Sequence, residues 1–247
     1  MPRVLVVQHE PSTGPGFFGT WLPEAGVELE VCHPYLGDPL PSLSSYDGLL
    51  VLGGAMGPSD DGACPWLPGT RELLALAVAQ RLPTFGICLG AELLVLACGG
   101  SVRRGVQGPE LGVLPIRLEP GAADDPVFAA VADGTRVLQW HWEEMSELPA
   151  GAELLATSAA YRHQVFRVGS AAWGVQGHPE VTGDIADAWA GEDTGLLATE
   201  GIAPDDLVAQ VRDAEAGLAA AWAPVARGFA AVVAAHAAGQ VATGGRR

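Results

Sequence analysis

Cys88 is the residue of this sequence whose surroundings most favour chemistry. It lies in residues 86–90 (Gly-Ile-Cys-Leu-Gly), after an apolar run and before an apolar helical pattern. Small residues on both sides of a nucleophile are typical of a tight strand-to-helix turn that holds the side chain above a sheet. The start of the following helix would lower the thiol pKa, and the N–H of Leu89 would donate to an oxyanion. A buried, inert cysteine in a turn fits this short pattern equally well.

His178 and Glu180 supply the groups that a cysteine nucleophile needs. They lie in residues 176–180 (Gln-Gly-His-Pro-Glu), after a run that predicts a strand. Pro179 keeps His178 extended, so that residues two apart project to the same side and Glu180 can reach the imidazole. A carboxylate on Nδ1 would leave Nε2 free to accept the thiol proton. The alternative is a turn histidine beside a solvated glutamate.

Two further places could contribute to the same site. Gly53 and Gly54 end a predicted strand, where ligand-binding loops lie in open α/β sheets, and could offer a second oxyanion N–H or form only a flexible turn. His141 ends another predicted strand and could be structural or line a pocket. The remaining histidines (His9, His33, His163 and His236) are interpreted as loop or surface residues, and the remaining cysteines (Cys32, Cys64 and Cys98) as unreactive.

The elements that must position these residues follow an α/β pattern. Strands are predicted at 4–8, 27–32, 49–52 and 83–87, and helices at 73–81 and 91–98. Strands are also expected at 113–118, 137–141, 153–157, 164–168 and 172–176. An Ala-rich helical region follows from 185 to 238, with a break at 201–204 and a frayed end at 243–247. We expect an open, mostly parallel sheet in residues 1–184 and a helical extension, 185–247, packed on the same domain.

Composition limits the classes of partner. The chain has 247 residues and a net charge of −16, and every basic residue is arginine. Nucleic acids and anionic membranes need a basic footprint, so neither is an expected partner. The start of the chain does not have the pattern of a signal peptide, and no long uncharged apolar stretch suggests a membrane span. The sequence therefore predicts a cytoplasmic protein that uses no metal and no cofactor.

Taken together, the motifs resemble the class I, triad-type glutamine amidotransferases. Gly53-Gly54, the 86–90 segment and the 176–180 segment occur in that family's order and spacing. Residues 108–112, 141–149 and 164–166 are similar to the amidotransferase domains of GMP synthases. The resemblance covers about residues 4–180 and implies the flavodoxin-like fold of that family. It also implies that Cys88 attacks the side-chain amide of glutamine, with a γ-glutamyl thioester as intermediate and His178 as proton relay.

The chain also departs from the family pattern. Glu92 stands where the family usually has a glutamine that touches substrate; it could bind the substrate's α-ammonium or indicate another γ-glutamyl substrate. Glu92 could also be simply a favourable acid near a helix start. No synthase domain accompanies the motifs, so an ammonia-accepting synthase would be a separate subunit. The alternatives that remain are a stand-alone γ-glutamyl hydrolase and an inert binding module.

Overall fold

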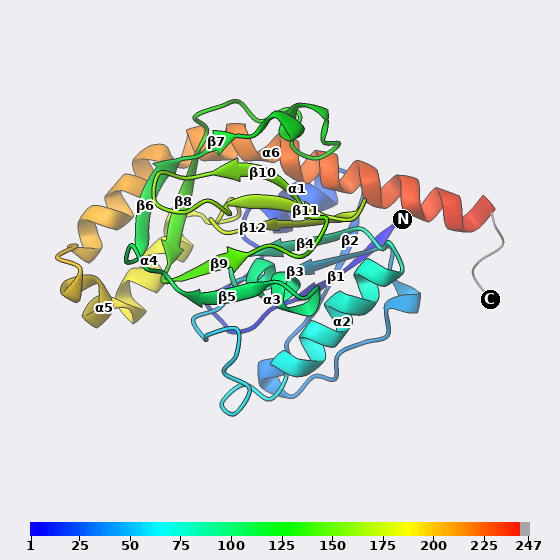
Figure 1. Cartoon of the computed structure of the whole chain (residues 1–247), viewed down its shortest axis with the longest axis horizontal. Coiled ribbons are helices and arrows are strands. Elements are labelled where there is room, and N and C mark those ends of the chain that lie inside the picture. Colours follow the sequence, from blue (N-terminus) through cyan, green and yellow to red (C-terminus); the bar gives the residue numbers. More distant parts are fainter. Residues whose placement is uncertain (243–247) are drawn as a thin grey trace.

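An eight-stranded sheet forms the centre of the protein (Figure 1), and the computed structural model describes residues 1–242. The strand order is β2-β1-β3-β4-β12-β11-β10-β7. The first five strands in that order are parallel, and β11, β10 and β7 continue the sheet in antiparallel fashion. The bounds are β1 Arg3–Val7, β2 Glu28–Cys32, β3 Gly48–Val51, β4 Thr84–Ile87, β7 Arg117–Leu118, β10 Glu153–Thr157, β11 Val165–Val168 and β12 Ala172–Val175. The expected open, mostly parallel sheet is confirmed.

Two short ribbons stand beside this sheet. One pairs β5 (Ser101–Arg104) with β9 (Glu143–Glu147), and the other pairs β6 (Glu110–Pro115) with β8 (Arg136–His141). The helices are α1 Phe18–Glu24, α2 Leu67–Ala79, α3 Leu89–Ala97, α4 Gly183–Glu192, α5 Thr194–Thr199 and α6 Pro204–Ala242. Three 3-10 turns complete the described elements: Pro34–Leu36, Leu43–Ser45 and Pro120–Asp124.

Alternation along the parallel strands divides the core between the two faces of the sheet. In β1, Val4 and Val6 pack with α1 and α6, whereas Leu5 and Val7 pack with α2 and α3. Successive strand residues point to opposite faces, so a strand covered on both sides must be apolar throughout. The sheet is therefore a buried middle layer, and the loops that follow its parallel strands lie at their carboxyl ends.

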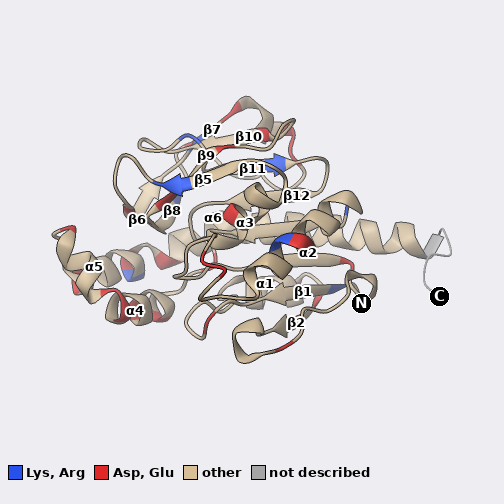
Figure 2. Cartoon of the chain, turned by 60° about the horizontal axis from the view of Figure 1, so that its bottom comes forward, with Lys and Arg blue, Asp and Glu red and all other residues tan. Residues whose placement is uncertain are grey.

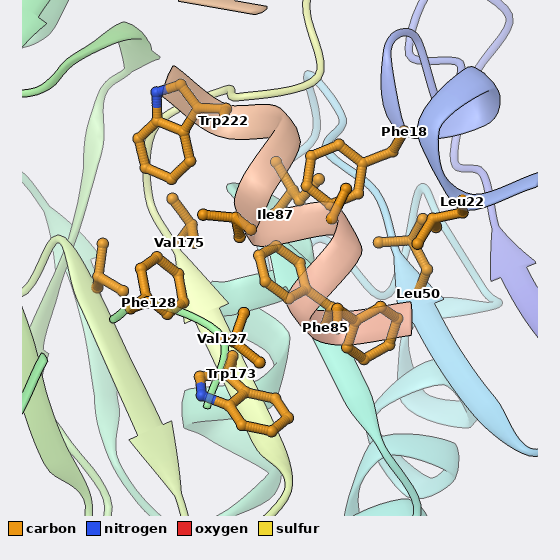
Figure 3. Close-up of a cluster of buried hydrophobic side chains, with 14 of the residues drawn as sticks. Phe18, Leu22, Leu50, Phe85, Ile87, Val127, Phe128, Trp173, Val175 and Trp222 are labelled. Atoms are coloured by element: carbon orange, nitrogen blue, oxygen red, sulfur yellow. The ribbon is translucent and has the colours of Figure 1, made fainter. Parts of the chain in front are cut away.

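Helix α6 belongs to the core although it comes after all the strands. Its Trp222, Phe229 and Val233 are fully buried in the same cluster as Phe85 of β4. Figure 3 shows Trp222 and Phe85 in this cluster. The indole N–H of Trp222 donates to the carbonyl of Arg136 at 2.8 Å. Residues 204–240 are also long and apolar enough to cross a membrane by length and composition, with a mean hydropathy of 1.6 in their most apolar window. In this fold the apolar face of the helix instead covers one side of the sheet.

Most expected elements are present, with differences that have physical causes. Helix α2 begins earlier than expected, at Leu67, because Pro68 is accommodated in the first helical turn. The break at 201–204 is present, and a second break at Asp193 separates α4 from α5. Helix α1 and strands β5 and β9 were not anticipated: α1 contains Pro23, and the two strands have largely polar sequences that are exposed or half-buried. The segment 243–247, expected to be frayed, lies outside the described residues.

Candidate active site

Cys88 follows β4 directly and adopts a backbone conformation that residues other than glycine rarely take. Its φ is 48° and its ψ is −110°. A Cβ on Gly86 would lie 2.6 Å from the carbonyl oxygen of Gly90, and one on Gly90 would overlap the carbonyl oxygen of Val51. Both glycines therefore allow the turn to lie tightly against the neighbouring backbone. The turn places Cys88 at the start of α3 and in the wall of a cavity.

His178 and Glu180 form a buried hydrogen-bonded pair after β12. The Nδ1 atom of His178 lies 2.9 Å from Oε1 of Glu180, and both side chains are almost fully buried. The N–H of His178 donates to the carbonyl of Leu138 at 2.7 Å, and the ring of Trp189 meets the imidazole edge-on with centroids 4.7 Å apart. These contacts fix the ring. The Nε2 atom of His178 has no hydrogen-bond partner within residues 1–242, and the His178 side chain lines the cavity.

Gly53 lies between the side chains of Cys88 and His178. A Cβ there would be 3.6 Å from Cβ of Cys88 and 3.0 Å from Cε1 of His178, so the structure brings both predicted residues to the same glycine. Gly54 lines the cavity, and the next N–H, that of Ala55, donates to Oε1 of Glu10 at 2.8 Å. Glu10 thus holds the loop that carries the two glycines.

The electrostatics of Cys88 differ from the expectation of an acidified thiol. Burial raises the pKa of the Cys88 thiol well above its usual value, the carboxylates of Glu92 and Glu180 raise it further, and only the Leu89 N–H acts in the opposite direction. The helix start does act on the sulfur, but desolvation and the nearby carboxylates outweigh it. The resting group is therefore a thiol, and its attack on a carbonyl requires a base.

Glu92 is a buried carboxyl in the cavity wall, 3% exposed. Its Oε1 accepts from Nε2 of Gln176 at 2.9 Å, and the same Nε2 lies 3.8 Å from Sγ of Cys88. Burial raises the pKa of Glu92 to about 7, although the Gln176 hydrogen bond lowers it. Gln176 therefore connects Glu92 with the sulfur.

His141 lines the cavity, one of the two roles expected for it, but both of its ring nitrogens already have hydrogen-bond partners. Nδ1 lies 2.7 Å from the carbonyl oxygen of Glu143, and Nε2 lies 3.2 Å from Oε2 of Glu110. Gln164 also donates to that Glu110 oxygen, at 2.7 Å. His141 therefore offers a substrate the face or edge of its ring rather than a free nitrogen.

The cavity, of about 180 Å³, is bounded by segments far apart in the sequence. Cys88, Glu92 and His178 line it together with residues of the helical extension, namely Trp189, Glu192, Asp193 and Leu196. Three hydrogen bonds tie this extension to the rest of the site: Trp189 Nε1 to the Ser12 carbonyl at 2.9 Å, Ser12 Oγ to Glu192 at 2.9 Å, and Trp140 Nε1 to Asp193 at 2.8 Å.

Several cavity residues carried no recognisable signal in the sequence. Gln176 lies inside the 176–180 segment, so its place next to the histidine could have drawn attention to it. Trp189 and Asp193 lie in an Ala-rich stretch whose pattern indicates only a helix. His9 lies in the loop after β1, as expected, but it is not a surface residue: it is fully buried behind Gly54, its Nδ1 accepts from Trp66 at 3.1 Å, and burial lowers its pKa to about 4.

Comparison with known proteins gives consistent results. The sequence model of the class-I glutamine amidotransferases matches residues 22–190, which include Cys88, His178 and Glu180. A glutamine-hydrolyzing GMP synthase subunit of Saccharolobus solfataricus is 32% identical over 63% of this chain and 78% of that protein. Gamma-glutamyl peptidase 4 of Arabidopsis thaliana is 30% identical over 58% of this chain, and the match spans 57% of the peptidase.

A solved structure extends the likeness to the whole fold. The crystal structure of a glutamine amidotransferase from Thermotoga maritima superposes with a TM-score of 0.84 at 27% identity, covering 93% of this chain and 98% of that one. The elbow-like turn, the His–Glu pair and the sheet that positions them are thus accompanied by family similarity over most of the sequence. The chain belongs to the class-I glutamine amidotransferase family.

Proposed function

We propose that this protein is a cysteine-dependent amidohydrolase that cleaves the γ-amide of glutamine or of a γ-glutamyl compound. The observation that carries the proposal is the convergence of Cys88 and the His178–Glu180 pair on Gly53, in the wall of one cavity. A nucleophile, a base and a group that orients the base are the requirements for acyl transfer through a covalent intermediate.

The reaction begins with a protonated thiol. As Sγ of Cys88 bonds to the γ-carbonyl carbon, Nε2 of His178 takes the thiol proton, and Glu180 stabilises the resulting imidazolium. The N–H of Leu89 and an N–H of the Gly53-Gly54 loop hold the carbonyl oxygen while it carries negative charge. His178 then passes the proton to the departing nitrogen, the C–N bond breaks, and a γ-glutamyl thioester remains.

Water completes the cycle. His178 takes a proton from the water as its oxygen attacks the thioester carbonyl, the C–S bond breaks, and the proton returns to the sulfur of Cys88. Glutamate leaves with a carboxylate at its γ position. Within the cavity, Glu92 is the group proposed to meet the α-ammonium of the glutamyl half, and the ring of His141 forms a wall beside it.

Two settings for this chemistry differ in what happens to the amine. A partner synthase could accept ammonia released from glutamine, as the name of the GMP synthase relative suggests. A stand-alone hydrolase would release an amine from a γ-glutamyl compound, as the name of the peptidase relative suggests. In both settings we place the protein in the cytoplasm, with a small-molecule substrate, and with neither nucleic acid nor membrane as a partner. An inert binding module would show neither activity.

The experiment is hydrolysis of glutamine and γ-glutamyl amides by the purified chain, with intact-mass detection of a γ-glutamyl adduct. We expect Cys88→Ala to abolish the adduct and to lower kcat/KM by about a thousandfold or more. Cys98→Ser, which replaces a cysteine outside the cavity, is the matched control and should keep activity. Turnover by Cys88→Ala at the wild-type rate would overturn the proposal. Activity that emerges only with an added synthase would favour the first setting.

A further inference from the structure

Three carboxylates stand together on one side of the cavity. They are Glu10, from the loop after β1, and Glu192 and Asp193, at the end of α4. Each accepts one hydrogen bond from an uncharged donor: Ala55 N, Ser12 Oγ and Trp140 Nε1, respectively. The pKa of Glu10 is raised by burial, and the negative charges of Glu192 and Asp193 raise it further. The three groups therefore share one electrostatic environment.

Within residues 1–242, these three charges are not balanced by a basic side chain in an ion pair. Arg104 is the arginine that lines the cavity, and it is paired with Glu143 at 3.3 Å and lies over the Trp142 ring. The wall thus presents negative charge that a bound ligand could neutralise. Figure 2 shows red acidic positions on α4, the helix at whose end Glu192 and Asp193 lie.

The position of this wall identifies which half of a substrate it faces. Glu192 and Asp193 lie three and four residues after Trp189, so they share its helix face, and Trp189 packs against His178. His178 delivers its proton to the leaving nitrogen, so the amine half departs on the histidine side. Glu92 lies on the α3 side, next to Gln176 and Cys88. The cavity therefore has an acyl side and an amine side.

A second feature of the same cavity also indicates a cationic ligand. Glu92 is nine-tenths buried or more, yet its Oε2 has no hydrogen-bond partner within residues 1–242 and its side chain lines the cavity. That oxygen is available to the α-ammonium of a glutamyl group. It leaves the three outer carboxylates to recognise something else.

We propose that the preferred substrate is the γ-glutamyl amide of a diamine. Such a substrate carries one positive charge on the α-ammonium of its glutamyl half and a second at the far end of its amine half. This inference rests on the proposed function. The ammonium at the far end of the diamine would lie among Glu10, Glu192 and Asp193. Hydrolysis adds one water molecule across the C–N bond and yields glutamate and the free diamine, with no oxidant or further reactant.

The test compares three probes that differ in the charge at the end of the amine: γ-glutamyl-putrescine, the uncharged γ-glutamyl-pentylamide of matched length, and γ-glutamyl-4-aminobutyrate. We expect kcat/KM to be highest for the first and lowest for the last, with an advantage of about tenfold for the cation over the uncharged amide. Added salt should reduce this advantage, because the carboxylates are partly exposed.

The isosteric double variant Glu192→Gln/Asp193→Asn keeps acceptors for Ser12 and Trp140 while removing both charges. We expect it to lower the ratio of kcat/KM for the cationic and uncharged amides by about tenfold. Asp187→Asn/Glu200→Gln is the matched control. It removes two exposed charges outside the cavity, one in α4 and one directly after α5, and should leave the ratio unchanged.

Each outcome separates the two proposals. An equal or higher kcat/KM for the uncharged or anionic amide would overturn the cationic subsite while leaving the amidohydrolase intact. The same conclusion follows if the double variant keeps the wild-type ratio. If none of the three probes is cleaved, the cationic subsite is overturned; if, in addition, glutamine is not hydrolysed and forms no γ-glutamyl adduct on Cys88, with or without an added synthase, the proposed function itself fails.

Discussion

At the scale of single residues, burial and, after it, two nearby carboxylates oppose the formation of a thiolate at Cys88. Glu92 and Glu180 both raise the pKa of the buried Cys88 thiol. A thiol held in its neutral form is protected from nonspecific alkylation, but it requires a base at the moment of attack. This explains why the His178–Glu180 pair is fixed by so many contacts, since the base has to be in place before the thiol can react.

Glu92→Gln is expected to stabilise the protein at alkaline pH. In the folded chain the pKa of Glu92 is about 7, against 4.5 as its ordinary value. The folded state therefore holds the proton more tightly, and stability is lost as pH rises from about 4.5 through 7. Above pH 7 the loss amounts to roughly 3 kcal/mol, which the glutamine variant avoids. Thermal melts between pH 5 and pH 8.5 should show the variant's advantage growing with pH.

The same substitution should increase the reactivity of Cys88. Removing the charge of Glu92 lowers the thiol pKa, so alkylation by iodoacetamide at pH 8 should be faster in the variant. Glu72→Gln, on the exposed face of α2, is the control for both measurements. A pH-independent difference in melting temperature, or an unchanged alkylation rate, would contradict this account of Glu92.

Sequence reasoning works for the residues of this site that belong to a local pattern. Cys88 and His178 each stand in a short motif beside an apolar strand, so chain position alone placed them at strand ends. The outer carboxylates have no such pattern. Glu192 and Asp193 reach the cavity because α4 packs against the loop after β1, and contacts between segments 180 residues apart leave no trace in local spacing.

At the scale of elements, the strand-to-helix turn depends on two glycines for different reasons. Gly86 leaves room for the backbone of Gly90, and Gly90 leaves room for the carbonyl of Val51 in β3. The turn is therefore packed against the neighbouring parallel strand as well as strained at Cys88. Its position relative to the Gly53-Gly54 loop, which continues β3, is set by that packing.

Gly90→Ala is expected to disrupt this arrangement. The new Cβ would overlap backbone atoms of Val51, which have no rotamer to change, so α3 or β3 must shift. We expect a loss of roughly 2–4 kcal/mol in the free energy of unfolding, together with a fall in kcat/KM for any γ-glutamyl amide that the wild type cleaves. Urea unfolding and the amide assay measure the two effects.

Gly217→Ala is the matched control. This glycine lies in α6 with no atom within 4 Å of a new Cβ, so the substitution should stabilise the helix by up to about 1 kcal/mol. If Gly90→Ala behaved like Gly217→Ala, the close approach of α3 to β3 would not be a constraint on the fold.

The two strands that the sequence did not predict, β5 and β9, share one property. They are rich in Arg and Glu, and all of their side chains except that of Met145 are exposed or half-buried. Apolar alternation identifies strands that bury one face, so a polar ribbon held by backbone pairing and cross-strand ion pairs escapes it. The parallel strands β1, β3, β4 and β12, almost fully buried, were recognised because their apolar runs are nearly continuous.

At the scale of the whole molecule, the helical extension supplies two things at once. Its first part, α4, forms the charged side of the cavity, and α6 covers one face of the central sheet. Large side chains of the central strands, such as Phe85 and Trp173, share one buried cluster with α6 (Figure 3), so the sheet without α6 would expose them. We therefore propose that residues 1–184 and 185–247 unfold as one cooperative unit, with the site assembled only when both are in place.

Trp222→Ala tests this unity. Trp222 is fully buried, donates to the Arg136 carbonyl and packs edge-on against Phe128 with ring centroids 6.3 Å apart. Its removal should cost roughly 3–5 kcal/mol. If the chain is a single cooperative unit, that loss lowers the midpoint of one unfolding transition for the whole chain. Circular dichroism and tryptophan fluorescence should then report the same midpoint. Asp213→Ala, an exposed position of α6, should leave the midpoint nearly unchanged. A separate early transition, with amide hydrolysis retained after it, would show instead that α6 is an independent unit and that the site does not depend on it.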